Sequence, residues 1–172
     1  MEHRQHSFFQ QENTEGITLI MATDANYNIG LNGKMLFHIP GDLANYKSIT
    51  MGKNLYCGRK TFDDMGPLEG RHITVLTRKS EVPGADRVIN SLDEFRETLL
   101  NDPNGYLVGG ANLVKKLMPY ITRILLTRTT ETFEADAGIG NPEDHGFKIV
   151  AESEEHFEIG IHYKYIEYRR EK

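Results

Sequence analysis

The sequence contains a single cysteine, no tryptophan and no long apolar run. The lone Cys57 excludes an internal disulfide framework and a cysteine-based zinc finger, and it favours a reduced, cytoplasmic protein. No apolar run approaches the roughly 20 residues that span a bilayer, so we expect no membrane association. Acidic residues outnumber basic ones by 25 to 20, for a net charge of -5, which argues against a general nucleic-acid binder.

Several catalytic and metal-binding signatures are also missing. The histidines show no metal-ligand spacing, and we expect His3 and His6 near the start to be solvated, so we predict no metal site. The sequence has no G-x-S-x-G nucleophile motif, no G-x-G-x-x-G and no Walker A pattern. Cys57 lies in an apolar stretch, which predicts an inert core thiol.

The length of 172 residues favours one domain, since domains commonly run about 100–200 residues. Residues 1–16 are polar and lack the basic-then-apolar pattern of a signal peptide. We expect these residues to form a disordered extension outside the fold, and residues 17–170 to form the domain.

Short apolar runs alternate with helical patterns along this domain. We expect strands at residues 17–22, 54–57, 72–77, 86–89, 106–108, 121–129, 148–151 and 158–168. We expect helices at residues 42–50, 58–65, 91–100 and 111–118, the third of which opens with a capping box of Ser91 and Glu94. The alternation predicts an α/β domain with a mostly parallel sheet, helices on both faces and an antiparallel C-terminal hairpin at one edge.

Two junctions join a strand to a helix through glycine. The first is Gly58, followed by Arg59, Lys60 and Thr61, and the second is the pair Gly109-Gly110, followed by Ala111 and Asn112. Glycine lets backbone amides approach a ligand, and the next helix N-terminus favours an anion, so either junction suits a phosphate. The alternative is that these glycines only make tight turns.

The basic pair Arg78-Lys79 and the acidic Asp42 are further candidates. The pair follows a strand, at the edge where α/β sheets bind ligands, and could hold an extra phosphate or be merely solvated. Asp42 follows residues 26–41, which have no periodicity and are expected to form a long irregular loop that covers a ligand. Asp42 could be an ordinary helix N-cap, or a carboxylate that recognises the amidine edge of a pyrimidine or pterin ring.

These residues together resemble the dihydrofolate reductase family from about Ile17 to Arg169. Ile29-Gly30 and the run from Met35 to Leu43 match the mobile active-site loop and its single acidic residue. Residues 58–62 match the cofactor turn G-R-x-T-[WF], and residues 67–71 match P-L-x-x-R. Residues 108–111 match a glycine pair that this family joins by a cis peptide. Each motif alone is weak, but their shared order and spacing make the resemblance strong.

The resemblance implies an eight-stranded sheet, NADPH as cofactor, and reduction of dihydrofolate to tetrahydrofolate. It also implies a monomer, with antifolates such as methotrexate and trimethoprim as inhibitors. Asp42 would be catalytic, gripping the pterin's amino group and ring nitrogen, and Thr127 would hydrogen-bond that pair. Arg71 would pair with the glutamate carboxylate of the substrate.

The resemblance also implies the remaining site residues. The substrate would contact Ala22, Leu36, Phe37, Asp42, Leu43, Tyr46, Met65, Leu68, Arg71, Val108 and Thr127. The cofactor would contact Ala22, Ile29, Gly30, Gly58, Arg59, Lys60, Thr61, Thr77, Arg78, Lys79, Gly109, Gly110, Ala111 and Asn112.

The sequence departs from the family pattern in two places. Leu36-Phe37 stands where the family usually has Pro-Trp, and Val114 stands where tyrosine is common. Two other functions stay open: a related reductase acting on a ribosylaminopyrimidine or another pterin, and a nucleotide-binding module without turnover. The presence of both Asp42 and Arg71 disfavours the first, and NADPH oxidation that depends on dihydrofolate would distinguish the second.

Overall fold

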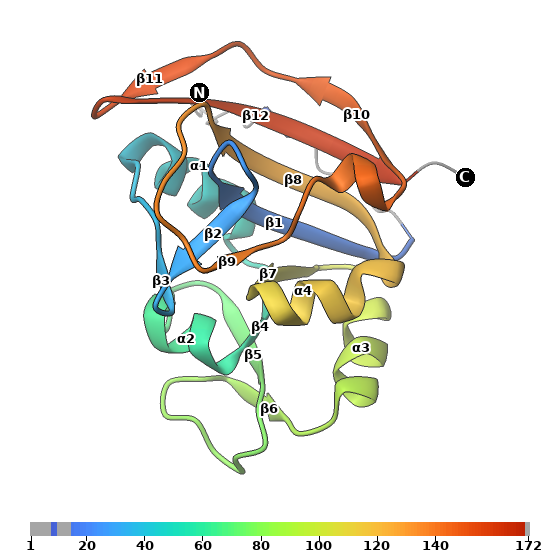
Figure 1. Ribbon diagram of the computed structural model, residues 1–172. Coiled ribbons are helices and arrows are strands. Elements are labelled where there is room, and N and C mark those ends of the chain that lie inside the picture. Colours follow the sequence, from blue (N-terminus) through green and yellow to red (C-terminus); the bar gives the residue numbers. More distant parts are fainter. Residues whose placement is uncertain (1–7, 10–14, 171–172) are drawn as a thin grey trace, which may run out of the picture.

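A central twisted sheet organises the computed structural model, which describes residues 8–9 and 15–170 (Figure 1). Eight strands follow one another in the order β10-β12-β8-β1-β7-β4-β5-β6, and the short β11 pairs with β12. Their bounds are β1 Ile17–Thr23, β4 Asn54–Gly58, β5 His72–Leu76, β6 Arg87–Ile89, β7 Gly105–Gly109, β8 Ile121–Thr129, β10 Phe147–Glu152, β11 His156–Glu158 and β12 Ile161–Arg170.

The sheet is mostly parallel, as predicted. Strands β8, β1, β7, β4, β5 and β6 all run in one direction, whereas β12 is antiparallel to β8, β10 and β11. The prediction of one continuous strand over residues 158–168 is wrong, because a turn at Ile159 and Gly160 separates β11 from β12. Both turn residues have a positive φ, 47° and 80°, which extended strands do not allow.

Helices cover both faces of the sheet. Helices α1 (Pro40–Thr50) and α2 (Arg59–Met65) contribute Ile49 and Phe62 to one buried cluster. Helices α3 (Leu92–Leu100) and α4 (Ala111–Leu117) contribute to the cluster on the other face, and the 3-10 turn η1 (Met118–Tyr120) follows α4 at Pro119. In the capping box of α3, Ser91 Oγ accepts a hydrogen bond from the Glu94 amide. Since both faces are covered, β1 is apolar on both sides, which explains its continuous apolar run.

The segment between β1 and α1 is more regular than predicted. Residues 26–41 contain the short strands β2 (Asn28–Leu31) and β3 (Lys34–Met35), and β2 also pairs with β9 (Ala137–Gly138). The two-residue turn Asn32-Gly33 joins β2 to β3 with φ of 53° and 80°. Asn-Gly is a strong hairpin signal, but strands of two to four residues are too short to show a period. A second 3-10 turn, η2 (Pro142–His145), precedes β10.

The region expected to lie outside the fold contributes two buried contacts. Phe9 is 4% exposed, and its ring lies edge-on to Tyr165 of β12 at 5.6 Å between centroids. Phe8 stacks on the same tyrosine at 6.4 Å. The expectation of an extension without contacts is therefore wrong at these two residues, because their rings cover part of the core. His3 and His6 lie outside the described residues.

Replacing Phe9 with alanine should lower the free energy of unfolding by about 3 kcal/mol, because truncating a buried phenylalanine removes its packing and leaves a cavity. The control is Phe157→Ala, since Phe157 is 63% exposed. Urea denaturation of the two variants measures the difference. Equal, small losses in both variants would show that the Phe9 contact adds nothing to stability.

None of the helices among the described residues is long and apolar enough to cross a membrane.

Candidate active site

The carboxyl ends of the parallel strands meet at one edge of the sheet. Gly58 ends β4, Gly109 ends β7, and Thr77 directly follows β5. Thr127 lies near the end of β8, opposite Ala22 of β1. The edge therefore brings together residues that are far apart in the sequence, as the strand order predicts.

Asp42 projects from the first turn of α1. The prediction that Asp42 caps this helix is wrong: Ile39 occupies the N-cap, without a side-chain hydrogen bond, and Pro40 begins the helix. Proline suits the first helical position because its fixed φ is helical and its missing N–H needs no partner there. Asp42 is thus the third helical residue, which frees its carboxylate for another partner.

That partner is Thr127. Its hydroxyl donates a 2.7 Å hydrogen bond to Asp42 Oδ1, and the two side chains are 5% and 9% exposed. The pKa of Asp42 is raised from 3.8 to about 6: burial raises it most, the hydrogen bond from Thr127 lowers it, and the charge of Glu158 adds to the rise. A carboxyl group in this range holds or releases a proton near neutral pH, which is what acid–base chemistry requires.

The raised pKa of Asp42 also has a cost in stability. A carboxyl whose pKa is higher in the folded state stabilises the fold below the unfolded pKa of about 3.9, and that contribution is lost as pH rises through about 6. Because asparagine does not ionise, Asp42→Asn should be more stable than the unmodified protein above pH 6, by about 1–3 kcal/mol.

Urea denaturation at about pH 4 and about pH 8 measures this effect. We expect the stability advantage of Asp42→Asn at the higher pH only. An advantage of the same size at both pH values would show that the ionisation of Asp42 does not oppose folding.

The Asp42–Thr127 pair lies on the face of the sheet that carries the apolar cluster of α1 and α2, because Thr127 is two residues from Leu125, a member of that cluster in β8. Six of the predicted substrate contacts are partly buried and pack against this cluster: Ala22, Leu36, Tyr46, Met65, Leu68 and Val108. The Tyr46 hydroxyl lies 4.0 Å from Met65 Sδ. Phe37 is buried and packs on Phe133 at 5.4 Å, so it fills the wall without a polar group. Leu43 differs from the others, since it is 41% exposed.

Arg71 carries a buried donor without a partner. Its Nη1 donates to Thr50 Oγ1 at 3.3 Å, and that hydroxyl in turn donates to the Tyr46 carbonyl at 2.8 Å. Within residues 8–9 and 15–170, Arg71 Nε is buried and has no hydrogen-bond partner. A buried unpaired donor is costly, so this guanidinium fits a carboxylate acceptor.

The two glycine junctions lie against each other. The peptide bond between Gly109 and Gly110 is cis, and a Cβ on Gly110 would lie 3.0 Å from Thr61 Oγ1 of α2. A Cβ built on Gly58 would meet the Gly110 amide at 4.0 Å. The backbone at this point therefore has little room for side chains, and a ligand here would meet main-chain groups of both junctions.

Arg59 adds positive charge to the paired junctions. Its Nε donates to Asp63 at 2.8 Å, while its Nη1 is buried and lacks a partner among the described residues. A guanidinium nitrogen without a partner suits an anionic group such as a phosphate. This geometry favours the phosphate-binding interpretation over the tight-turn alternative.

The loop after β5 presents Arg78 and Lys79 to solvent. Asn90 holds the loop, because its side-chain amide donates to the Thr77 and Lys79 carbonyls at 2.7 and 2.8 Å. The two basic side chains therefore stand at the carboxyl edge on a fixed backbone. Of the other predicted cofactor contacts, Lys60 and Asn112 are exposed, and Ala111 is the first residue of α4. Gly30 of β2 pairs with Met35 of β3. Ile29 packs against the apolar cluster of α3 and α4, on the other face of the sheet.

The prediction of an inert thiol at Cys57 agrees with the structure. Cys57 is fully buried, and burial raises the pKa of its thiol to about 12, so it is an inert core residue as predicted. Within the described part of the chain, no group of His, Cys, Asp or Glu side chains could hold a metal ion.

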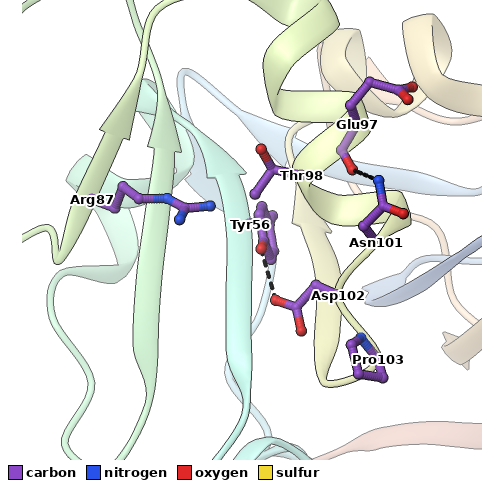
Figure 2. Close-up of a pocket in the computed structure, with 7 residues that line it drawn as sticks. All are labelled: Tyr56, Arg87, Glu97, Thr98, Asn101, Asp102 and Pro103. Carbon is purple, nitrogen blue, oxygen red and sulfur yellow. Dashed lines mark hydrogen bonds between the residues drawn. The ribbon is translucent and has the colours of Figure 1, made fainter.

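A separate hollow lies beside α3, away from Asp42 (Figure 2). Asp102, one of the two acidic residues that line it, accepts hydrogen bonds from the Tyr56 hydroxyl at 2.7 Å and from the Asn54 side-chain amide at 2.8 Å. These groups satisfy one another, so they tie β4 to the turn after α3 and form a structural network.

Two acidic residues near the site were not predicted. The carboxylate of Asp24 is completely buried and accepts hydrogen bonds from the Asn26, Asn28 and Phe133 amides. Burial alone would raise its pKa, but these bonds lower it below the ordinary value. The other is Glu158, which contacts the first turn of α1. The position of Asp24 directly after the apolar β1 could have indicated a site residue, whereas no local sequence pattern indicates one at Glu158.

Comparisons with known proteins agree with this site. The model of the dihydrofolate reductase family matches residues 16–170. A dihydrofolate reductase of Bacillus subtilis is 35% identical over 78% of this chain and 82% of its own length, and one of Enterococcus faecium is 34% identical over 77% and 83%. The solved structure of Enterococcus faecalis dihydrofolate reductase, complexed with NADP(H) and RAB-propyl, superposes with a TM-score of 0.80 at 28% identity, over 92% of this chain and 98% of that one. The chain belongs to the dihydrofolate reductase family.

Proposed function

We propose that this chain catalyses the NADPH-dependent reduction of dihydrofolate to tetrahydrofolate. The observation that carries the proposal is the buried Asp42 carboxyl, hydrogen-bonded to Thr127 on the face of the sheet that carries the apolar cluster of α1 and α2. A carboxylate in a low-dielectric wall pairs well with two adjacent N–H donors, such as the amino group and ring nitrogen of a pterin. The catalytic residue is Asp42.

Asp42 orients the pterin and favours its protonation. With a pKa of about 6, the carboxyl is largely ionised at neutral pH, and the carboxylate stabilises positive charge on the bound ring. Thr127 fixes Asp42 Oδ1, which leaves Oδ2 for the ring donors. The apolar wall from Leu36, Tyr46, Met65 and the other cluster members excludes water, which strengthens both interactions.

Arg71 binds the other end of the substrate. Its buried Nε lacks a partner in the described chain and suits the glutamate carboxylate of dihydrofolate. The hydrogen bond to Thr50 fixes the guanidinium, so little side-chain freedom is lost on binding. Asp42 and Arg71 therefore select a substrate with paired donors at one end and a carboxylate at the other.

The residues at the glycine junctions fit NADPH, which supplies the hydride when bound. Gly58 and Gly110 are partly exposed and have no side chain that would keep a ligand from the main chain, and Arg59 offers Nη1, which has no partner among the described residues, to a phosphate. Thr61, Thr77, Ala111 and Asn112 surround these groups. Arg78 and Lys79 favour a cofactor with the additional 2′-phosphate, so we propose NADPH over NADH.

The proposal extends to the form in which the protein acts. Residues 17–170 are the catalytic domain, and one chain supplies every residue of the site, so the enzyme works as a monomer. A buried thiol at Cys57 is compatible with the cytoplasm. Antifolates such as methotrexate and trimethoprim carry amidine-like donor pairs, and we propose that Asp42 binds them as it binds the pterin.

The absorbance of NADPH, followed with and without dihydrofolate, tests the proposal. We expect oxidation that depends on dihydrofolate, at a higher rate with NADPH than with NADH. Oxidation with a ribosylaminopyrimidine instead would favour the related reductase. NADPH binding without oxidation by any of these substrates would show a binding module.

A further inference from the structure

Glu158 joins the end of β11 to the first turn of α1. Its Oε1 accepts a 2.9 Å hydrogen bond from the Gly41 amide, and Gly41 directly precedes Asp42. The Tyr163 hydroxyl donates to the same oxygen at 3.5 Å. A Cβ on Gly41 would lie 2.6 Å from Glu158 Oε1, so the close approach depends on glycine at this position.

The sheet holds Glu158 in place. Residues His156 and Glu158 are two apart in β11, so they share a face, and β11 pairs with β12 from Ile161 to Tyr163. The His156 ring stacks on Tyr163 at 5.3 Å with an interplanar angle of 23°. Tyr165, two residues further along β12, lies opposite Thr127 of β8. This face of β11 and β12 is therefore continuous with the strand that binds Asp42, at the edge seen above α1 in Figure 1.

We infer that Glu158 is a positioning residue for the proposed reduction: its hydrogen bond to the Gly41 amide fixes the first turn of α1 and brings a second carboxylate to the residue that precedes Asp42. The inference rests on the proposed function, in which Asp42 binds and protonates the pterin. Glu158 acts only through Gly41 and Asp42.

The electrostatic part of this inference depends on which groups surround Asp42. Glu158 stands on β11, Tyr163 and Tyr165 on β12, and the uncharged Thr127 on β8. Burial and the charges of Glu158 and Asp42 raise the pKa of Tyr163, and burial followed by the charge of Asp42 raises that of Tyr165. Both hydroxyls therefore stay neutral at working pH.

The other titratable groups on this face of the sheet either carry no charge or interact with residues other than Asp42. Tyr46 and Cys57 are buried, and burial raises the pKa of each, so neither carries charge. The positive charge of Arg71 lowers the pKa of Tyr46. The His156 ring stacks on Tyr163 and contacts Tyr165 in a tilted arrangement. Among the described residues, Glu158 is the charged group whose field raises the pKa of Asp42.

Two substitutions separate the charge of Glu158 from its hydrogen bond. Glu158→Gln keeps an oxygen that accepts from the Gly41 amide but removes the charge. Glu158→Ala removes both. The matched control is Glu155→Gln, which removes the charge of an exposed residue three positions earlier.

The first readout is the carboxyl carbon shift of Asp42, followed by NMR through a pH titration of the ligand-free protein. We expect Glu158→Gln to lower the midpoint by about half a pH unit, and Glu155→Gln to leave it unchanged, because exposed charges at a distance are screened. The same midpoint in Glu158→Gln and the unmodified protein, or an equal shift in the control, would overturn the inference.

The second readout is turnover. Glu158→Gln should move the pH profile of kcat to lower pH by the same amount as the titration, with KM for dihydrofolate preserved. Glu158→Ala should also raise KM by about 3- to 10-fold, because it frees the first turn of α1. A pH profile that does not move with the charge would overturn the inference. A titration shift in a protein that does not oxidise NADPH with dihydrofolate would instead contradict the proposed function alone.

Discussion

The Asp42→Asn variant is expected to reduce dihydrofolate about 100- to 10,000-fold more slowly than the unmodified protein, the range typical for loss of an acid–base group. Asparagine keeps the size of the side chain and an oxygen that accepts from Thr127. It loses the negative charge that pairs with the pterin's donors and the capacity to bind a proton. The affinity for NADPH should remain nearly the same, because the residues proposed to hold the cofactor lie at the two glycine junctions.

Stopped-flow oxidation of NADPH measures the rate, and isothermal titration calorimetry measures NADPH binding. Thr127→Val is the companion variant, since it removes the hydrogen bond to Asp42 and keeps the carboxylate. We expect a smaller loss there than in Asp42→Asn. A collapse of NADPH affinity with normal residual turnover would show that the role assigned to Asp42 is wrong.

Replacing Arg71 with alanine should raise KM for dihydrofolate by about 10- to 100-fold, with little change in kcat. Charge-assisted hydrogen bonds contribute about 1.5–3 kcal/mol, and the proposed pair with the glutamate carboxylate forms equally in the ground and transition states. Arg71→Lys keeps the charge without the planar fork and should recover only part of the affinity.

A dihydropterin without the glutamate tail is the control substrate for this prediction. Its KM should be the same for Arg71→Ala and the unmodified protein, since it offers no carboxylate to Arg71. Steady-state kinetics with both substrates measure the difference. An equal rise in KM for both would mean that Arg71 supports the pocket wall and does not bind the tail.

Much of the sheet could be predicted from the sequence because its strands are buried on both faces. The runs that became β1, β4, β5 and β8 are rich in apolar residues, and helical segments separate most of them. Both glycine junctions were also visible, since each glycine directly follows such a run. What local patterns did not reveal is that Thr61 contacts the second junction, which depends on the order of strands in the sheet.

Other parts of the structure depend on contacts that no local pattern marks. Phe8 and Phe9 stand in a polar stretch, and no local pattern predicts their packing on Tyr165. Glu158 is 117 residues from Gly41, and an acidic residue in an edge hairpin is ordinarily solvated. Asp42 has the residue type of an N-cap, but the proline two positions earlier begins the helix and moves Asp42 into its first turn.

The pH dependence of hydride transfer tests most directly the claim that Asp42 promotes protonation of the pterin. NADPH-loaded enzyme is mixed with dihydrofolate in a single turnover, and the rate is recorded across the pH range around 6, the pKa of Asp42. The account predicts a rate that falls as pH rises through the pKa of the bound complex, and a much lower rate without that transition in Asp42→Asn. The same pH dependence in both proteins would contradict it.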